Sequence, residues 1–372
     1  MPSQMLTCFL LITLLFGTFT LAEGQGTPPY YEENIADSNP IRTEQVRELE
    51  TYIQSLKQDK VRLDRLFQPD YSSPEAYTSS TRKLRQAFEK SIGYPPLGNA
   101  PKEAPIFKKI GEDGIGTYYR VSIPILPKVN AVGIYIVPKG LKGRAPLIIS
   151  MHGGGGSPEI ALFRGGGNYH DMVRGGVKRG YVVFAPTHLF SAEGYPRDIR
   201  NKIDERLRLV GTSLSAVEIA KISRSLDVLL KRPEVDPKRV GMVGLSYGGY
   251  YTLVTTALEP RIKAAVSSCY FGVQEYRYAQ DENGIPSDFR FPDRFSLFTD
   301  DKLVALICPR ALEIQAGRTD APTHREMGKV LAPLGAEHYS KVGKADSFRF
   351  VVFDSGHDFW DATAWEFLGK HL

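Results

Sequence analysis

The stretch of sequence that decides the fold is Val-Gly-Met-Val-Gly-Leu-Ser-Tyr-Gly-Gly-Tyr, residues 240–250. Its apolar start predicts a buried strand, and its end opens a helical stretch over residues 248–257. Between them lies a Gly-X-Ser-X-Gly pentad. In such a pentad the serine sits on a sharp turn from strand to helix and projects its hydroxyl above the sheet. We therefore expect Ser246 to be a nucleophile. The alternative is a tight turn that simply needed two glycines.

Short β-rich runs alternate with helical stretches on both sides of the pentad. The later strands are continuous apolar runs, which is typical of strands buried on both faces. This alternation predicts an α/β fold with a mainly parallel, doubly wound sheet flanked by helices, whose catalytic groups lie at the carboxyl ends of the strands. We expect strands at 118–123, 133–137, 146–151, 181–185, 240–243, 264–267, 311–315 and 348–353, and helices at 213–231, 248–257, 323–334 and 361–371.

A second glycine cluster, His-Gly-Gly-Gly-Gly at residues 152–156, follows one of these strands. Backbone N–H groups in such a turn can hold a negatively charged oxygen. We expect Gly154, then Gly155, to supply one oxyanion donor and the N–H of Tyr247 to supply the other. His152 is expected to orient the loop. A flexible loop or a phosphate cradle is the alternative, but no Gly-Lys-Ser/Thr follows, so a phosphate-binding loop does not fit.

A serine nucleophile needs a base, and the base needs an orienting acid. His357 lies between the last expected strand and the last helix, and we expect it to be the base. Asp320 follows the penultimate strand, and we expect it to be the acid. Asp354 and Asp358 are rivals, but they adjoin the histidine in sequence, where a short side chain seldom reaches Nδ1. The resulting order is Ser246, Asp320, His357.

Three further stretches carry a family resemblance: residues 232–240, residues 259–268 and the loop 317–320. From about residue 105 to 372 the chain resembles α/β-hydrolases of the dienelactone-hydrolase-like and acetylxylan-esterase-like groups. The resemblance implies an α/β-hydrolase fold and a serine carboxylic ester hydrolase that works through an acyl-enzyme, without a cofactor. Dienelactone hydrolases use a cysteine where this chain has Ser246, and the Arg-Gly-Gln-Gly-Gly stretch of cephalosporin-deacetylase-type esterases is absent. The substrate therefore stays open.

Two other functions remain open at this stage. The run at residues 246–250 also resembles prolyl-oligopeptidase-type peptidases, but those carry a large β-propeller ahead of the hydrolase domain, and only about 80 helical residues precede it here. The second alternative is a hydrolase-like protein that has lost activity and serves in binding. Such a protein usually lacks a triad residue, and none is missing here.

The N-terminus predicts export. Residues 5–16 are almost all apolar, and small or polar residues follow as far as Ala22, which indicates a secretory signal peptide. An uncleaved anchor is the alternative, because this stretch could nearly span a bilayer. We expect a secreted or periplasmic protein with no other membrane segment. The predicted parts are a signal peptide (1–22), a linker (23–40), a packed helical extension (41–104) and a hydrolase domain (105–372).

Composition excludes several classes. The 372 residues are 42% hydrophobic and 24% charged, which excludes disorder and a polytopic membrane protein. The net charge of +5 is small and not clustered, so we expect no nucleic-acid partner. Cys269 and Cys308 have no second cysteine or histidine at metal-ligand spacing, so we expect free thiols and no metal site. The oligomeric state stays open.

Two long segments could face the substrate. The insertion at about 270–301 is rich in aromatics, and Tyr270 and Phe271 are our candidates for substrate contacts; the alternative is a small core that holds the insertion together. Residues 188–209 contain four arginines, which could favour a uronate or form a solvated basic face. Because both segments mix aromatic and charged residues, we expect a small-molecule or polysaccharide substrate with short acyl esters, acetyl to butyryl.

Overall fold

The computed structural model describes residues 30–57, 59–99, 101–163, 167–189, 197–280 and 285–372, so the expected signal peptide lies outside the described residues. The chain divides into two compact units, Met1–Gln54 and Ser55–Leu372. The first unit contains the 3-10 helix η1 (Ile35–Ser38) and most of α1 (Asn39–Lys57), whose last turn belongs to the second unit. The C-terminal end of the expected linker is therefore helical. None of the helices in the described ranges is long and apolar enough to cross a membrane.

The helical extension continues at the start of the second unit with α2 (Lys60–Leu66), α3 (Pro74–Ser80) and α4 (Arg82–Ile92). The Ser73 side chain accepts a hydrogen bond from the N–H of Ala76 at 3.0 Å, so it caps α3. Gly93 ends α4 in a left-handed conformation. The face of α4 that carries Leu84, Phe88 and Ile92 is buried in the core. The part of the extension that belongs to the second unit is therefore packed as predicted, whereas α1 has no buried residue.

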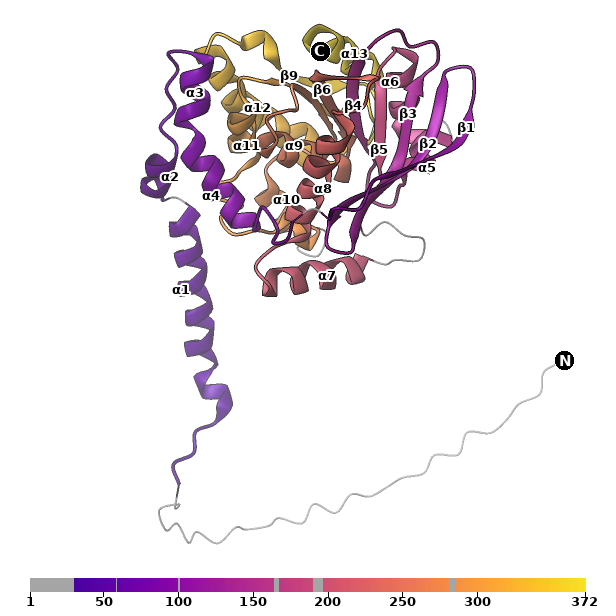
Figure 1. The fold of residues 1–372 in the computed structure, drawn as a ribbon. Coiled ribbons are helices and arrows are strands. Elements are labelled where there is room, and N and C mark those ends of the chain that lie inside the picture. The colour runs from indigo at the N-terminus through magenta and orange to yellow at the C-terminus, as the bar shows by residue number, and fades with distance from the viewer. Residues whose placement is uncertain (1–29, 58, 100, 164–166, 190–196, 281–284) are drawn as a thin grey trace, which may run out of the picture. The chain divides into compact units, whose positions relative to one another are not determined.

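A nine-stranded sheet forms the centre of the second unit (Figure 1). Its order is β1-β2-β3-β5-β4-β6-β7-β8-β9. Neighbouring strands from β1 to β5 in this order are antiparallel. Neighbouring strands from β5, through β4, to β9 are parallel. The predicted α/β fold with a mainly parallel sheet is confirmed. The strands are β1 (Ile106–Glu112), β2 (Gly116–Leu126), β3 (Val129–Pro138), β4 (Ala145–Met151), β5 (Val182–Pro186), β6 (Val235–Leu245), β7 (Ala264–Ser268), β8 (Ala311–Gly317) and β9 (Phe348–Phe353).

Helices cover both faces of the sheet, as a doubly wound topology requires (Figure 1). In β4, Leu147 and Ile149 belong to one core and Ile148 belongs to the other, because successive side chains point to opposite faces. The first core includes α8 (Leu214–Leu229), α9 (Tyr247–Leu258), α11 (Asp300–Ile307) and α12 (Pro322–Lys341), and the second includes α5 (Pro158–Phe163), α6 (Met172–Lys178) and α13 (Asp361–His371).

The remaining elements lie in the connections: η2 (Gly167–Tyr169), α7 (Arg197–Leu209), α10 (Gln274–Gln280), η3 (Ser287–Phe289) and η4 (Ala345–Ser347). Cys269 follows the carboxyl end of β7, and Cys308 precedes the amino end of β8. These two strands are parallel neighbours, so the two residues lie at opposite edges of the sheet. Both are buried free thiols, which confirms the prediction.

Candidate active site

Ser246 occupies the turn between β6 and α9 with φ 60° and ψ −114°. A non-glycine residue rarely adopts a positive φ, so the surrounding structure must hold this conformation. The N–H of Ser246 donates to the carbonyl oxygen of Ser268 at the end of β7, at 2.8 Å. The hydroxyl does not cap α9, although serine is a preferred capping residue.

The two glycines of the pentad allow backbone segments to meet. A Cβ on Gly248 would lie 2.1 Å from the carbonyl oxygen of Met151, and a Cβ on Gly244 would lie 2.2 Å from the carbonyl oxygen of Gly248. Any side chain at either position would therefore push the end of β4 or the start of α9 away. This crowding explains why the turn that presents Ser246 has glycine at positions 244 and 248.

Asp320 and His357 lie in the loops after β8 and β9, and His357 Nδ1 is 2.9 Å from Asp320 Oδ1. Burial alone would raise the pKa of Asp320, but the hydrogen bond with His357, and then the electrostatic effect of the neighbouring imidazoles His324 and His357, lower it below its usual value. The carboxyl group is therefore ionised and accepts the hydrogen bond, and Nδ1–H donates it. The Asp320 side chain is 4% exposed and that of His357 is 40% exposed, so only the imidazole faces solvent.

The two rival carboxylates have other partners. Asp354 pairs with Arg318 at 3.0 Å on the surface. Asp358 accepts hydrogen bonds from the N–H of Gly356 and from the hydroxyl of Ser355, so it shapes the loop that carries His357. The arrangement therefore brings His357 together with Asp320 rather than with its neighbours in sequence.

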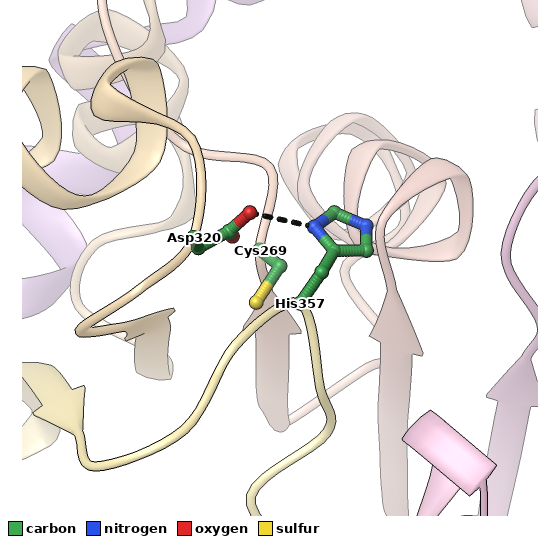
Figure 2. Close-up of side chains that lie close together, drawn as sticks. All are labelled: Cys269, Asp320 and His357. Carbon is green, nitrogen blue, oxygen red and sulfur yellow. Dashed lines mark hydrogen bonds and ion pairs between the residues drawn. The ribbon is translucent and has the colours of Figure 1, made fainter.

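The site is assembled from the carboxyl ends of four adjacent strands, β6 to β9. Figure 2 shows Asp320, His357 and Cys269 grouped at this edge, with Cys269 directly after β7. The N–H of Cys269 donates to the carbonyl oxygen of Gln315 in β8, and its Sγ lies 3.3 Å from the carbonyl oxygen of Asp358. Cys269 thus lies between the serine turn and the loops that carry Asp320 and His357, a position that sequence reasoning did not notice.

The glycine loop after β4 lies against the serine turn. A Cβ on Gly153 would lie 3.5 Å from Cβ of Ser246, and a Cβ on Gly154 would lie 3.6 Å from the ring of Tyr247. Tyr247 is the first residue of α9, where helical N–H groups have no partner within the helix. The glycine loop therefore lies next to both Ser246 and the first residue of α9.

Within the loop, some N–H groups are already used. The N–H of Gly153 donates to the hydroxyl of Tyr169 at 3.0 Å, and that of Gly156 donates to the carbonyl oxygen of Gly153 at 3.1 Å. The N–H groups of Gly154 and Gly155 have no partner among the residues that the structure describes. Gly154 and Gly155 therefore remain the candidate donors.

A buried cluster of histidines and charged residues supports the glycine loop after β4. His152 and His188 contact each other edge to face, and each ring bonds to the other's backbone, with distances of 2.7 and 3.2 Å. Glu218 and Lys221 are both fully buried in α8 and form an ion pair. Glu218 also lies 3.8 Å from His188 Nδ1. The Lys221 ammonium group donates a hydrogen bond to the carbonyl oxygen of Thr187. Despite its burial, Glu218 has a pKa below its usual value because of Lys221 and His188, so it is ionised.

His152 therefore orients the loop as expected, but its supporting residues were missed. Burial, together with His188, holds the pKa of His152 well below its usual value, so this ring is neutral. A second missed residue is His324, at the start of α12. Its ring centroid lies 5.9 Å from that of His357, and burial lowers its pKa to about 4.

The arginine-rich segment is divided: Arg206 is exposed, as the solvated-face alternative expects, whereas Arg200 and Arg208 have partners within the protein. Arg200 is buried, lies 3.9 Å from Asp288 and stacks over the ring of Tyr247 at 4.6 Å. Arg208 bonds to Asp204 at 2.7 Å. These arginines are therefore charge-compensated within the protein.

The prediction that Tyr270 and Phe271 contact substrate needs correction. Each is 1% exposed. The Tyr270 ring packs 5.1 Å from Tyr250, and the Phe271 ring packs 6.4 Å from Phe350. The alternative, a small core that holds the insertion, fits these contacts, because rings this buried bind the insertion to α9 and β9.

Comparisons with known proteins agree with the fold and the resemblance. Residues 160–288 match the model of the dienelactone hydrolase family. The chain is 27% identical over 239 residues to the hydrolase-type protein YtaP of Bacillus subtilis. The aligned region covers 61% of this chain and 78% of YtaP. The family match supports the prediction of a carboxylic ester hydrolase.

Solved structures of carbohydrate esterases share the fold. A glucuronoyl esterase from Solibacter usitatus is 16% identical with a TM-score of 0.62, over 80% of this chain and 93% of that chain. Acetyl xylan esterase 1 from Thermoanaerobacterium sp. is 19% identical with a TM-score of 0.52, over 78% of this chain and 98% of that chain. At these identities the likeness establishes the α/β-hydrolase fold.

Proposed function

We propose that this chain, an α/β-hydrolase with a dienelactone hydrolase family domain, is a serine carboxylic ester hydrolase with the triad Ser246, Asp320 and His357. One observation carries the proposal. The hydrogen-bonded pair of Asp320 and His357 lies at the same sheet edge as a serine held at φ 60°. Structural turns seldom keep a strained serine beside such a pair, whereas nucleophilic catalysis requires both.

The proposed mechanism is acyl transfer. His357 Nε2 takes the proton of Ser246 as the oxygen attacks the ester carbonyl. The N–H of Tyr247 and that of Gly154 or Gly155 bind the oxyanion. Asp320 keeps the proton on Nδ1 and stabilises the imidazolium. The imidazolium then protonates the leaving alcohol, and water attacks the acyl-enzyme by the reverse sequence to release the acid.

The substrate class that we propose is a carbohydrate carrying short acyl esters, met outside the cytoplasm. The carbohydrate esterases that share this fold support it, and so does the apolar run at residues 5–16, which favours export. The helix α7 carries Lys202, Glu205 and Arg206 at exposed positions. Burying a long alkyl chain against such residues would desolvate charged groups.

The substrate panel also tests an apolar cavity that is lined by none of the proposed catalytic residues. An apolar cavity of about 590 Å³ lies between α7, the start of α8 and the β2–β3 turn, with Leu189, Ile203 and Leu207 in its wall. If this cavity takes the acyl group, kcat/KM should rise with acyl chain length, because each buried CH₂ would contribute about 0.8 kcal/mol of binding.

The experiment combines labelling with a substrate panel. A fluorophosphonate should label the protein and fail to label Ser246→Ala. With 4-nitrophenyl esters, kcat/KM should be greatest from acetate to butyrate and fall for chains of eight carbons or more. Acetylated xylan, a methyl ester of glucuronic acid and a peptide amide identify the natural bond. Cleavage of only the peptide amide would favour the peptidase alternative, and labelling of Ser246→Ala would overturn the nucleophile.

A further inference from the structure

Cys269, Asp320 and His357 form a cluster that the proposed chemistry does not fully use (Figure 2). One ligand atom from each, a thiol sulfur, a carboxylate oxygen and an imidazole nitrogen, all lie within 4.8 Å of one another. Two ligands of one tetrahedral zinc ion lie about 3.3–3.7 Å apart, given bond lengths of about 2.0–2.3 Å. Small side-chain rotations would therefore let the three atoms bind a single ion.

A second observation points to a ligand at this place. Asp320 is 92% buried, and its second carboxylate oxygen, Oδ2, accepts no N–H or O–H from the described residues; the neighbouring Cys269 thiol, a weak donor, interacts with this carboxyl. Buried polar atoms are nearly always satisfied, so a buried carboxylate oxygen with no stronger donor than a thiol needs an explanation. A cation would satisfy it.

We infer that Cys269, Asp320 and His357 bind a thiophilic divalent cation such as Zn²⁺, and that this cation reversibly switches off the hydrolase. The binding part stands on the geometry alone, and the switch rests on the proposed function. The thiol loses its proton to solvent as the S–Zn bond forms. Thiolate, carboxylate and Zn²⁺ then sum to zero charge, which suits a buried site.

The switch follows from the histidine tautomer. Without the ion, Nδ1 carries the proton that it donates to Asp320, and Nε2 is free to accept a proton from Ser246. An ion on Nδ1 needs the lone pair of that nitrogen, so the proton moves to Nε2. The imidazole can then no longer act as a general base, although its position is nearly unchanged.

The Cys269 thiol has no part in the proposed acyl transfer, although it is buried directly beside Asp320 and His357. As a ligand it would be deprotonated by the bound cation. The ion can reach the site beside the His357 side chain, which is 40% exposed. Spacing in the sequence gave no sign of this site, because the ligands follow three different strands.

The activity test uses the chelator-treated full chain and its second buried cysteine as a matched control. Zn²⁺ should lower 4-nitrophenyl acetate hydrolysis at least about tenfold, and EDTA should restore it, whereas Mg²⁺, which prefers oxygen ligands, should have no effect. Each variant is compared with its own metal-free rate. Cys269→Ser should need at least about tenfold more Zn²⁺ for half-inhibition, and Cys308→Ser should respond as the wild type does.

The binding test is independent of activity. Cd²⁺ added to the wild type, to Cys308→Ser and to Ser246→Ala should produce one equivalent of the ultraviolet absorption of a cadmium thiolate, and Cys269→Ser should produce none. Absence of this band in the wild type, or its presence in Cys269→Ser, would overturn the site. A band in a chain that hydrolyses no ester would keep the site and reject the proposed function instead. A band together with unaltered hydrolysis would overturn the switch.

Discussion

His357 Nδ1 donates to Asp320 Oδ1 at 2.9 Å across 37 residues of sequence. The loops that carry the two residues touch: a Cβ on Gly317 would lie 1.8 Å from the carbonyl oxygen of Gly356. This contact fixes the distance between the loops, and the hydrogen bond then fixes the ring. The pair is therefore built into the ends of β8 and β9 rather than formed by chance on the surface.

This relationship predicts the effect of Asp320→Asn. An amide in place of the carboxylate can donate to Nδ1, which stabilises the wrong tautomer, and it cannot stabilise the imidazolium. In other serine hydrolases this exchange lowers kcat by about 10⁴-fold, and we expect about 10³–10⁴-fold here with 4-nitrophenyl acetate. Asp354→Asn is the matched control, because Asp354 pairs with exposed Arg318, and its kcat should stay within about twofold. Equal losses in both variants would count against Asp320.

The glycine of the serine turn gives a second prediction. Gly248→Ala places a methyl group 2.1 Å from the carbonyl oxygen of Met151, so either β4 or α9 must shift. We expect a loss of about 1–3 kcal/mol or more in the free energy of unfolding, measured by urea denaturation. For Gly114→Ala, where a Cβ meets nothing within 4 Å, the change should be below about 0.5 kcal/mol.

The sequence predicted those parts of the fold whose signal is local. The β6–Ser246–α9 unit could be predicted because an apolar run, two glycines and a helical stretch follow each other directly. β1 was missed because it is a mostly exposed edge strand, with Lys108 and Lys109 in its middle and no apolar alternation. Within the predicted helical extension, the sequence gave no boundary at Thr81, where α3 ends and α4 begins.

Parts of the site that depend on burial could not be predicted. Glu218 and Lys221 are three residues apart on a helix, a spacing that normally indicates an exposed ion pair. Only the packing of α8 against the segment after β5 makes them a buried support for His188. Likewise, the sequence of the aromatic insertion does not indicate which rings are buried. For that reason it predicted that Tyr270 and Phe271 contact the substrate.

The buried ion pair leads to a third prediction. Glu218→Gln leaves the ammonium group of Lys221 without a counter-charge in a fully buried position. We expect a loss of about 3–5 kcal/mol in the free energy of unfolding. Asp227→Asn on the same helix removes the more exposed partner of Arg261 and should cost less than about 1 kcal/mol. Similar losses from both variants would argue that Glu218 and Lys221 contribute no more than a surface pair.

The last prediction separates a core role from a substrate role for the aromatic insertion. Phe271→Ala empties a fully buried site beside Phe350, so it should lower the free energy of unfolding by about 3–5 kcal/mol. Because the ring is not accessible, KM for 4-nitrophenyl acetate, measured well below the unfolding transition, should change by less than about twofold. Tyr278→Ala, in α10, removes a ring that is 37% exposed and should cost no more than about 1 kcal/mol. A several-fold rise in KM for Phe271→Ala with unaltered stability would restore the original assignment, since only contact with the substrate affects binding without affecting folding.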